Sequence, residues 1–456
     1  MKPNDRAMSS DDIKATLRAA ELDQALWFSR IHDAYEAYRS VDMTSEWLAD
    51  YRTLRSKRLF SHIKEAVPAY RGVDFDSDAD LDELLLSFAP VSKTVLRDNF
   101  VDHCSDDIDP TNCRLISTSG TTGEPFNFVR TRDQMVDGHA LGWVRDVRWK
   151  IPFGSRVIRP NQDWLPDWFE HTVPAERLAR VVQFGDVEDP RLRFEFARRS
   201  REFAPHVVIG HPSYLRKFAS LLAEGGQTLD DAIAIFTFGE NLTAGIRQEL
   251  EAGLGAPLYD IYGLKEFGAV AAQFPECGNY HITDESLYVE ILDSSGSRLP
   301  DGEVGEITIT DFTNFAMPFV RYRTGDTGSL RAPACTCGAP HRVLDLIDGR
   351  SAGEFALPGG ERSSIGRLTR VARGYSVRSF QFVARSGGRI ELNLEALPGL
   401  RGDDVRDLER RITDMLRGSA SVAVRIVDRS EFAVSPSGKV VDFVDMTEGD
   451  IASRQA

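Results

Sequence analysis

Short apolar runs alternate with amphipathic stretches through the middle of the chain. Each apolar run has the length of a buried strand, and the runs are residues 156–158, 207–210, 232–238 and 258–262. The amphipathic stretches repeat apolar residues at helical spacing, and they are residues 133–149, 213–223 and 243–254. Strands that alternate with helices form a mostly parallel sheet, and ligands bind at the carboxyl ends of its strands. We therefore predict an α/β fold.

Other patterns flank this region. Apolar residues recur at helical spacing through residues 10–66, so we expect helical structure there. Residues 287–292 and 305–310 have the pattern of a β hairpin. Near the C-terminus we expect three strands and one amphipathic helix, at residues 376–384, 389–394, 421–427 and 403–416.

These patterns divide the chain into two domains. Residues 1–347 are predicted to form a large N-terminal domain with mostly parallel sheets and a β region. A hinge is expected at residues 348–350, where small and turn-forming residues gather. Residues 351–456 then form a small α+β domain.

Composition excludes several classes of partner. The chain has 456 residues and a formal charge of −15, which argues against nucleic acid or an anionic membrane as partner. No apolar run reaches the length of a membrane span, and the N-terminus lacks the apolar core of a signal peptide. We therefore expect a cytoplasmic protein whose five cysteines are reduced or metal-bound. A homodimer remains open.

A loop rich in Ser, Thr and Gly follows the apolar pair Leu115 and Ile116. Glycines let a backbone approach a ligand closely, and turned N–H groups with hydroxyls hold phosphate oxygens. The loop is not a Walker A motif, because no Gly-Lys-Ser/Thr follows at the required spacing. A plain turn between hairpin strands is the alternative interpretation. The expected phosphate-binding residues are Ser119, Gly120, Thr121, Thr122 and Gly123.

Three further motifs follow the loop in order. They are Tyr262-Gly263-Leu264-Lys265-Glu266, Arg321-Tyr322-Arg323-Thr324-Gly325-Asp326 and Ser437-Gly438-Lys439. With the loop, they make the chain resemble the adenylate-forming ligases, which include acyl-CoA synthetases and adenylation domains. The chain is most similar to the phenylacetate–CoA ligase branch, which also includes capsule-biosynthesis proteins. The resemblance is strong over residues 114–350 and looser beyond.

The resemblance implies a reaction. A small carboxylic acid, with an aromatic acid favoured, would attack the α-phosphate of ATP and release pyrophosphate. The acyl adenylate would then pass to CoA, a carrier-protein thiol or an amine, with the C-terminal domain acting as a lid. Activation of another oxyanion such as nitrite, an amide-forming ligase and a non-catalytic nucleotide-binding homologue remain as alternatives.

The resemblance also assigns roles to residues. Glu266 would hold Mg²⁺ through its carboxylate, and Lys439 would neutralise charge developing at the α-phosphate. Lys265 stands where the branch usually has Thr, so we add it to the catalytic candidates. Taken singly, Asp326 is equally a turn residue and Lys439 a solvated lysine. Besides the loop, the expected ATP contacts are Gly239, Glu240, Asn241, Tyr262, Gly263, Asp326 and Arg350.

The hinge region departs from the family pattern. The branch usually has an acidic residue within two positions of Arg350, whereas Ser351-Ala352-Gly353 stands here. The basic Gly loop that meets CoA in relatives is replaced by Leu357-Pro358-Gly359-Gly360-Glu361. Domain rotation and the identity of the acceptor therefore stay open.

A set of metal ligands is predicted as a second site. Cys277 and His281 are separated by three residues and Cys335 and Cys337 by one, and Cys₃His is an ordinary structural zinc set. Several members of the branch carry Cys and His at these places. His341 is a competing ligand, and reduced cysteines without metal are the alternative. Cys104 and Cys113 fit no pattern and are expected to pack in the protein interior.

Overall fold

The computed structural model describes most of the chain. The described residues are 27–76, 79–118, 126–160, 168–177, 179–184, 193–331, 335–348, 354–356, 362–416, 419–433, 440 and 443–446. The predicted phosphate loop at residues 119–123, Arg350 and Lys439 lie outside these ranges. None of the described helices is both long and apolar enough to cross a membrane.

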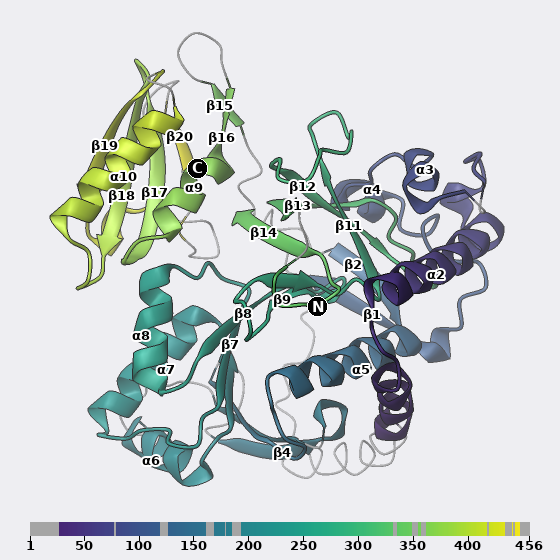
Figure 1. The fold of residues 1–456 in the computed structure, drawn as a ribbon, viewed down its shortest axis with the longest axis horizontal. Coiled ribbons are helices and arrows are strands. Elements are labelled where there is room, and N and C mark those ends of the chain that lie inside the picture. The colour runs from purple at the N-terminus through teal and green to yellow at the C-terminus, as the bar shows by residue number, and fades with distance from the viewer. Residues whose placement is uncertain are drawn as a thin grey trace, which may run out of the picture.

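A long sheet runs through the larger part of the protein (Figure 1). Its described strands follow the order β11-β12-β13-β14-β10-β9-β8-β7-β6-β3-β5-β4. The parallel part confirms the predicted strands and adds β5, and it consists of β3 (Arg156–Pro160), β5 (Ala179–Phe184), β6 (Val207–Gly210), β7 (Ala234–Phe238) and β8 (Leu258–Leu264). β4 (Phe169–Val173) pairs antiparallel with β5 at the edge.

Helices cover both faces of the parallel strands. On one face lie α6 (Arg193–Phe203), α7 (Pro212–Glu224) and α8 (Ala244–Leu254), and on the other lies α5 (Arg132–Arg148) (Figure 1). Threonine hydroxyls cap the amino ends of α5 and α8. The Thr131 hydroxyl accepts a hydrogen bond from the backbone N–H of Gln134, and the Thr243 hydroxyl accepts one from that of Ile246. Leucines of α7 and α8 are fully buried against β6 and β7. The predicted helices at 133–149, 213–223 and 243–254 are confirmed.

The rest of the sheet is antiparallel. Its strands are β9 (Gly268–Gln273), β10 (Tyr280–Ile282), β11 (Leu287–Leu292), β12 (Gly305–Asp311), β13 (Tyr322–Arg331) and β14 (Val343–Asp348). The predicted hairpin at 287–292 and 305–310 is confirmed as β11 and β12. A separate hairpin of β1 (Cys113–Thr118) and β2 (Phe126–Thr131) contributes Phe126 and Phe128 to the same buried cluster as β9 and β13.

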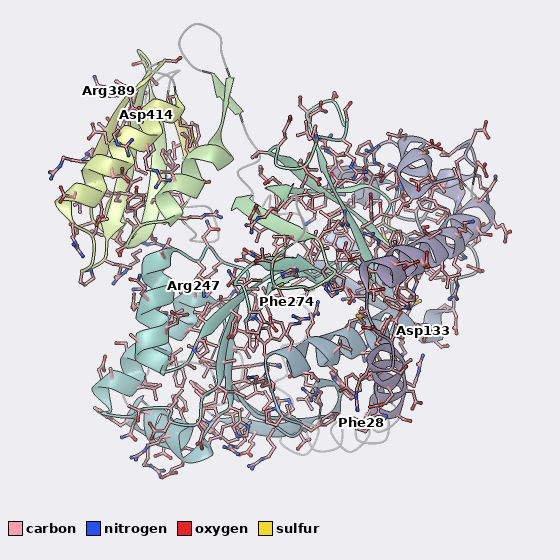
Figure 2. The ribbon with its side chains drawn as sticks, in the orientation of Figure 1. Phe28, Asp133, Arg247, Phe274, Arg389 and Asp414 are labelled. Carbon is pink, nitrogen blue, oxygen red and sulfur yellow. The ribbon has the colours of Figure 1, made fainter. Side chains whose placement is uncertain are left out.

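The N-terminal region is helical but not continuous. Residues 27–39 form one helix, and α2 (Ser45–Ala66) begins after an extended break where the Thr44 hydroxyl accepts from the backbone of Trp47. The first helix packs on α5, where the rings of Phe28 and Trp143 lie 5.6 Å apart and Arg30 pairs with Asp133 (Figure 2). Short elements follow, and they are α3 (Leu81–Leu86), α4 (Lys93–Asp98) and the 3₁₀ turns η1 (Pro68–Tyr70), η2 (Pro110–Asn112) and η3 (Pro174–Glu176).

The C-terminal region encloses a core of its own. Its sheet has the order β19-β18-β17-β20, and its two helices contribute Leu368, Leu408 and Ile412 to a buried cluster with Phe382 and Leu392. The elements are β15 (Glu354–Ala356), β16 (Arg362–Ser364), α9 (Ile365–Arg373), β17 (Val377–Arg385), β18 (Arg389–Ala396), α10 (Gly402–Met415), β19 (Ser421–Ile426), η4 (Arg429–Glu431) and β20 (Phe443–Met446).

The two regions meet at α8, beside β17 (Figure 1). The Thr243 hydroxyl donates to the Val377 carbonyl at 2.6 Å, and Leu397 joins the buried cluster of α7 and α8. In addition, Arg373 Nη2 donates to Asn241 Oδ1 at 3.0 Å. The C-terminal region therefore rests on the loop that contains two of the predicted ATP contacts, Glu240 and Asn241.

Candidate active site

Two of the predicted motifs, far apart in sequence, meet through crossed hydrogen bonds. The Tyr262 hydroxyl donates to Asp326 Oδ2 at 2.7 Å, and the Tyr322 hydroxyl donates to Glu266 Oε1 at 3.1 Å. Each motif thus supplies a tyrosine to the carboxylate of the other. Burial and the charge of Asp326 raise the pKa of Tyr262 well above its ordinary value, so this hydroxyl stays a donor. The structure therefore brings three predicted ATP-site residues together.

Curvature of the sheet makes this meeting possible. Strands β8 and β13 are separated by β9, β10 and β14, which on a flat sheet is about 19 Å at roughly 4.8 Å per strand. No tyrosine and carboxylate side chain span that distance together. The antiparallel part of the sheet must therefore fold back toward β8, and the shared cluster of β9, β11, β12 and β13 fills the space that it encloses.

A buried ion pair holds the second motif in place. Arg321 has a left-handed backbone, with φ of 48°, which is uncommon for a residue other than glycine. Its guanidinium binds Glu290 through two contacts of 3.1 Å and donates to the Phe88 carbonyl at 2.9 Å. Both side chains are buried. This anchor sets the position from which Tyr322 and Asp326 reach β8.

The predicted ATP contacts Gly239, Glu240 and Asn241 directly follow strand β7. A Cβ at Gly239, whose φ is +74°, would lie 2.7 Å from the His211 ring, so only glycine fits. The Glu240 carboxylate accepts hydrogen bonds at 2.9 Å from both the backbone and the hydroxyl of Ser213, at the start of α7. Asn241 meets Arg373 of the C-terminal region. Glu240 and Asn241 thus have protein partners, a structural role that the sequence did not indicate.

Lys265 and Glu266 do not pair, although they are neighbours in sequence. Glu266 is buried against Tyr322, whereas Lys265 is exposed. Among the residues that the structure describes, none forms an ion pair or hydrogen bond with Lys265. Gly263, two positions earlier, is needed for close approach, since a Cβ there would lie 2.8 Å from the Gly268 carbonyl in the β8–β9 hairpin.

A pocket of about 220 Å³ lies between α5 and the sheet. Ile261 precedes Tyr262, and Ala269 pairs with Gly263 across the hairpin, so one end of the pocket adjoins the Tyr262 motif. Apolar side chains dominate this end and the walls, and they include Trp143, Ile209, Phe236, Ile261, Ala269 and Ala272. A cavity of about 150 Å³ is known to hold benzene, so the pocket has room for an acid with one ring.

Charged residues of α5 also line this pocket. His139, Trp143 and Asp146 stand at helical spacing on one face of the helix, and Arg177 approaches Asp146 at 3.9 Å. The apolar spacing of residues 133–149 predicted this helix but not a site role for its polar residues. The signal was present, because charged residues at i+3 or i+4 from a buried tryptophan must lie on the same face. Trp143 itself is both a core residue and a pocket residue.

A larger pocket of about 550 Å³ lies elsewhere, between α2 and the β2–α5 junction. It is lined by charged residues such as Arg55, Asp109 and Asp133, and none of the motif residues borders it. Its mixed charge and distance from the motifs give it no part in the candidate active site.

The predicted metal ligands converge. The ligand atoms of Cys277, His281, Cys335 and Cys337 all lie within 4.8 Å of one another. The Sγ atoms of Cys277 and Cys337 each lie 3.4 Å from His281 Nε2. A tetrahedral zinc with ordinary bond lengths places such S and N atoms about 3.6 Å apart. The four side chains therefore fit a zinc ion.

The protonation states of the histidine and of Cys335 also favour metal binding. Burial lowers the pKa of His281 to about 4, and its Nδ1 donates to the His341 carbonyl at 3.2 Å, so the neutral Nε2 faces the cysteines. Burial opposes ionisation of Cys335, but hydrogen bonds from Cys337 and Asn279 outweigh it and lower the pKa of that thiol to about 7. Burial raises the pKa of Cys277 to about 11, which a bound cation would reverse.

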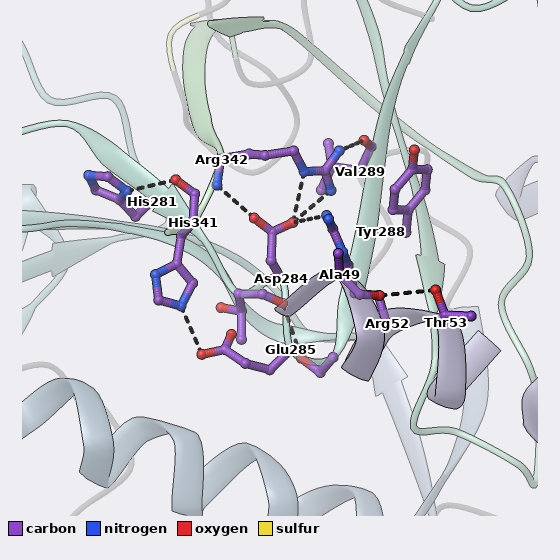
Figure 3. A network of polar contacts seen from close by, with 12 residues as sticks. Ala49, Arg52, Thr53, His281, Asp284, Glu285, Tyr288, Val289, His341 and Arg342 are labelled. Atoms are coloured by element: carbon purple, nitrogen blue, oxygen red, sulfur yellow. Dashed lines mark hydrogen bonds and ion pairs between the residues drawn. The ribbon is translucent and has the colours of Figure 1, made fainter. Parts of the chain in front are cut away.

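A network of buried charges supports the histidine (Figure 3). His341, the competing ligand, instead binds Glu285 with its Nε2 at 2.9 Å. Arg342 donates to Asp284 from its backbone at 2.7 Å and from its side chain at 2.7 and 2.9 Å. Arg52 of α2 approaches the same carboxylate at 3.6 Å. The network fixes the segment whose carbonyl orients His281. Cys104 packs against an apolar cluster, as expected.

Comparisons with known proteins agree with this architecture. Residues 53–316, more than half of the chain, match the family of AMP-binding enzymes. A phenylacetate-coenzyme A ligase of Thermus thermophilus is 33% identical over 33% of this chain and 35% of its own length. That of Escherichia coli is 30% identical over 52% of this chain and 55% of its own length. The chain thus spans a third to about half of these curated relatives.

The fold of this chain is also similar to that of a solved structure. A 2-hydroxyisobutyryl-CoA ligase in the postadenylation state has a TM-score of 0.64 and 18% identity, covering 86% of this chain and 88% of that one. Fold and sequence together define an AMP-binding enzyme, and the chain belongs to that family. The curated relatives that it matches include phenylacetate-coenzyme A ligases, so its similarity is to the branch that the motifs predicted. The predicted fold class and family are confirmed.

Proposed function

We propose that this protein is an ATP-dependent ligase that adenylates a small carboxylic acid and transfers the acyl group to a thiol or amine. The observation that carries the proposal is the pairing of Tyr262 with Asp326 and of Tyr322 with Glu266 beside an apolar pocket. The acid would occupy the pocket with its carboxylate toward Tyr262. Asp326 would bind the ribose of ATP and Glu266 would hold Mg²⁺, a cation that prefers oxygen ligands.

Charge neutralisation by residues of this chain would drive the chemical step. Adenylation needs an attacking carboxylate held in line with the α-phosphate and stabilisation of the charge that develops there. Ser119 to Gly123 would hold the departing phosphates, and Lys439 would stabilise the charge at the α-phosphate. Lys265, exposed beside Glu266, would add a further cation near the phosphates. Zinc at the Cys₃His cluster would have a structural role, since one of its ligands, His281, lies in β10.

The acceptor would be CoA, and this assignment rests on similarity to phenylacetate-coenzyme A ligases. The replaced glycine loop at residues 357–361 keeps a carrier-protein thiol and an amine as second candidates. Activation of nitrite is disfavoured by the size and apolar walls of the pocket, which suit a ring.

Pyrophosphate release in the presence of ATP, Mg²⁺ and single acids tests the proposal. The panel contains aromatic acids, short aliphatic acids and nitrite. Glu266→Gln should lower the apparent affinity for Mg²⁺, and Lys439→Ala should cut the rate by about 10²–10³. Glu202→Gln, an exposed glutamate of α6, is the matched control and should change nothing. Failure of every compound to release pyrophosphate would favour the non-catalytic homologue.

A further inference from the structure

The far end of the pocket differs from the end beside Tyr262. Asp146 and Arg177 line it near the amino ends of β3 and β5, where Arg177 Nη1 donates to the Ile151 carbonyl at 2.7 Å. Trp149 of the same wall donates to the carbonyl of Gln273, the last residue of β9. Because β9 runs antiparallel to β8 and Ala271 pairs with Tyr262, Gln273 lies two residues from that pairing, toward the amino end of β8. An acid whose carboxylate lies at Tyr262 therefore directs its other end toward Asp146.

The Asp146 carboxyl lacks a hydrogen bond. Among the described residues none donates to it, and Arg177 stays 3.9 Å away, beyond hydrogen-bond distance. Its side chain is 32% exposed, yet it lines the pocket rather than the outer surface. Burial raises its pKa to about 7, while Arg177 and Arg145 act in the opposite direction and Glu176 in the same one. A carboxyl that lines an apolar pocket without accepting a hydrogen bond is costly, and the ion pair with Arg177 at 3.9 Å leaves its acceptor capacity unused.

The neighbouring cations are held by other partners. Arg177 is 7% exposed, donates to Ile151 and stacks 4.5 Å from the Phe153 ring, while its buried Nε has no partner among the described residues. Arg145 donates to Thr283 at 2.6 Å. Neither guanidinium donates a hydrogen bond to Asp146, although Arg177 forms an ion pair with it at 3.9 Å. The Asp146 carboxylate, which lines the pocket, is therefore open to accept a hydrogen bond.

We propose that the acid bears a hydrogen-bond donor, a hydroxyl or an amino group, at the end remote from its carboxylate, and that Asp146 accepts that hydrogen bond. This inference rests on the proposed function in placing the carboxylate at Tyr262. The substrate class is thereby narrowed to hydroxy- or amino-substituted acids with one ring. Asp146 acts as a specificity-determining residue, because a site built to hydrogen-bond a substrate hydroxyl strongly rejects the analogue that lacks it.

Matched acids test the wild-type protein. Benzoate and phenylacetate are compared with their meta- and para-hydroxy, amino and methoxy derivatives, in pyrophosphate release and in equilibrium binding by calorimetry. At least one hydroxy or amino acid should exceed both the plain acid and its methoxy counterpart by tenfold or more, since methoxy accepts but does not donate. Equal values for donor-bearing and plain acids would overturn the inference while leaving the ligase activity intact.

Variants assign the preference to Asp146. Asp146→Leu should abolish the preference by lowering activity on the substituted acid to the level of the plain acid. Asp146→Asn, which keeps an acceptor oxygen, should restore part of the preference. Asp133→Asn, an exposed aspartate of the same helix, is the control. Donor-dependent binding without pyrophosphate release would uphold this inference and refute the ligase. An undiminished preference in Asp146→Leu would refute the assignment.

Discussion

Replacing Asp146 by Asn should stabilise the protein, and the gain should grow with pH. Burial holds the pKa of this carboxyl at about 7 in the folded protein against an ordinary value of 3.8. A folded-state pKa above the unfolded one means that the folded protein keeps the proton longer, so the wild type loses stability as pH rises from about 4 to 7. The amide does not titrate. The stability of the variant relative to the wild type therefore increases as the pH rises from about 4 to 7.

The magnitude follows from the two pKa values. The difference between the folded and ordinary pKa values corresponds to about 4 kcal/mol of unfolding free energy. About 2.6 kcal/mol of this loss occurs between pH 5 and pH 8. Because 32% of the Asp146 side chain is exposed, solvent screens its charge, and we halve the loss between pH 5 and pH 8 to about 1.3 kcal/mol. Arg177, Arg145 and Glu176 are the charged groups that face Asp146.

Urea unfolding at pH 5 and pH 8, followed by tryptophan fluorescence, measures the effect. All six tryptophans lie before residue 169, so the signal reports on the N-terminal region alone. The difference in unfolding free energy between Asp146→Asn and the wild type should rise with pH, and Asp133→Asn should show no such trend. A pH-independent difference, or one that falls as pH rises, would refute the reasoning about burial.

Three further perturbations probe other parts of the protein. Purified protein should contain about one zinc per chain. Cys335→Ser should lower both the zinc content and the melting temperature, because metal binding is coupled to folding. Absence of zinc from protein prepared without chelator would refute the metal site. Glu290→Ala leaves Arg321 buried and unpaired, which should cost about 3–5 kcal/mol in urea unfolding. Gly245→Val places a side chain where a Cβ would already lie 2.6 Å from Leu397. It should speed proteolysis of the C-terminal region while leaving the tryptophan melt unchanged.

Local patterns predicted most of the elements. Alternating apolar runs and amphipathic stretches located β3, β6, β7 and β8 and their helices within a few residues, because periodicity reports which face of each element is buried. Within the helical region expected over residues 10–66, the chain leaves the helix at residues 40–44. Thr44 was a usable signal, since its hydroxyl caps α2. Strands β4 and β5 at the sheet edge were missed.

The metal cluster illustrates a choice between equivalent candidates. Cysteine and histidine spacing identified the ligand set, but His281 and His341 were chemically equal in the sequence. Their packing separates them, because His281 turns its Nε2 toward the cysteines while His341 binds Glu285. Such a choice depends on the orientation of a ring, which spacing along the chain does not encode.

The sequence by itself determined the family, the alternation of strands and helices, and the identity of the motif residues, because these depend on residue type and near-neighbour order. Tertiary structure alone decided that Tyr262 reaches Asp326 and that Tyr322 reaches Glu266, since both contacts require the sheet to curve across three intervening strands. It also decided that Asp146 lies at the end of an apolar pocket. The composition of that pocket arises from packing α5 on six strands, a long-range arrangement that leaves no mark in local periodicity.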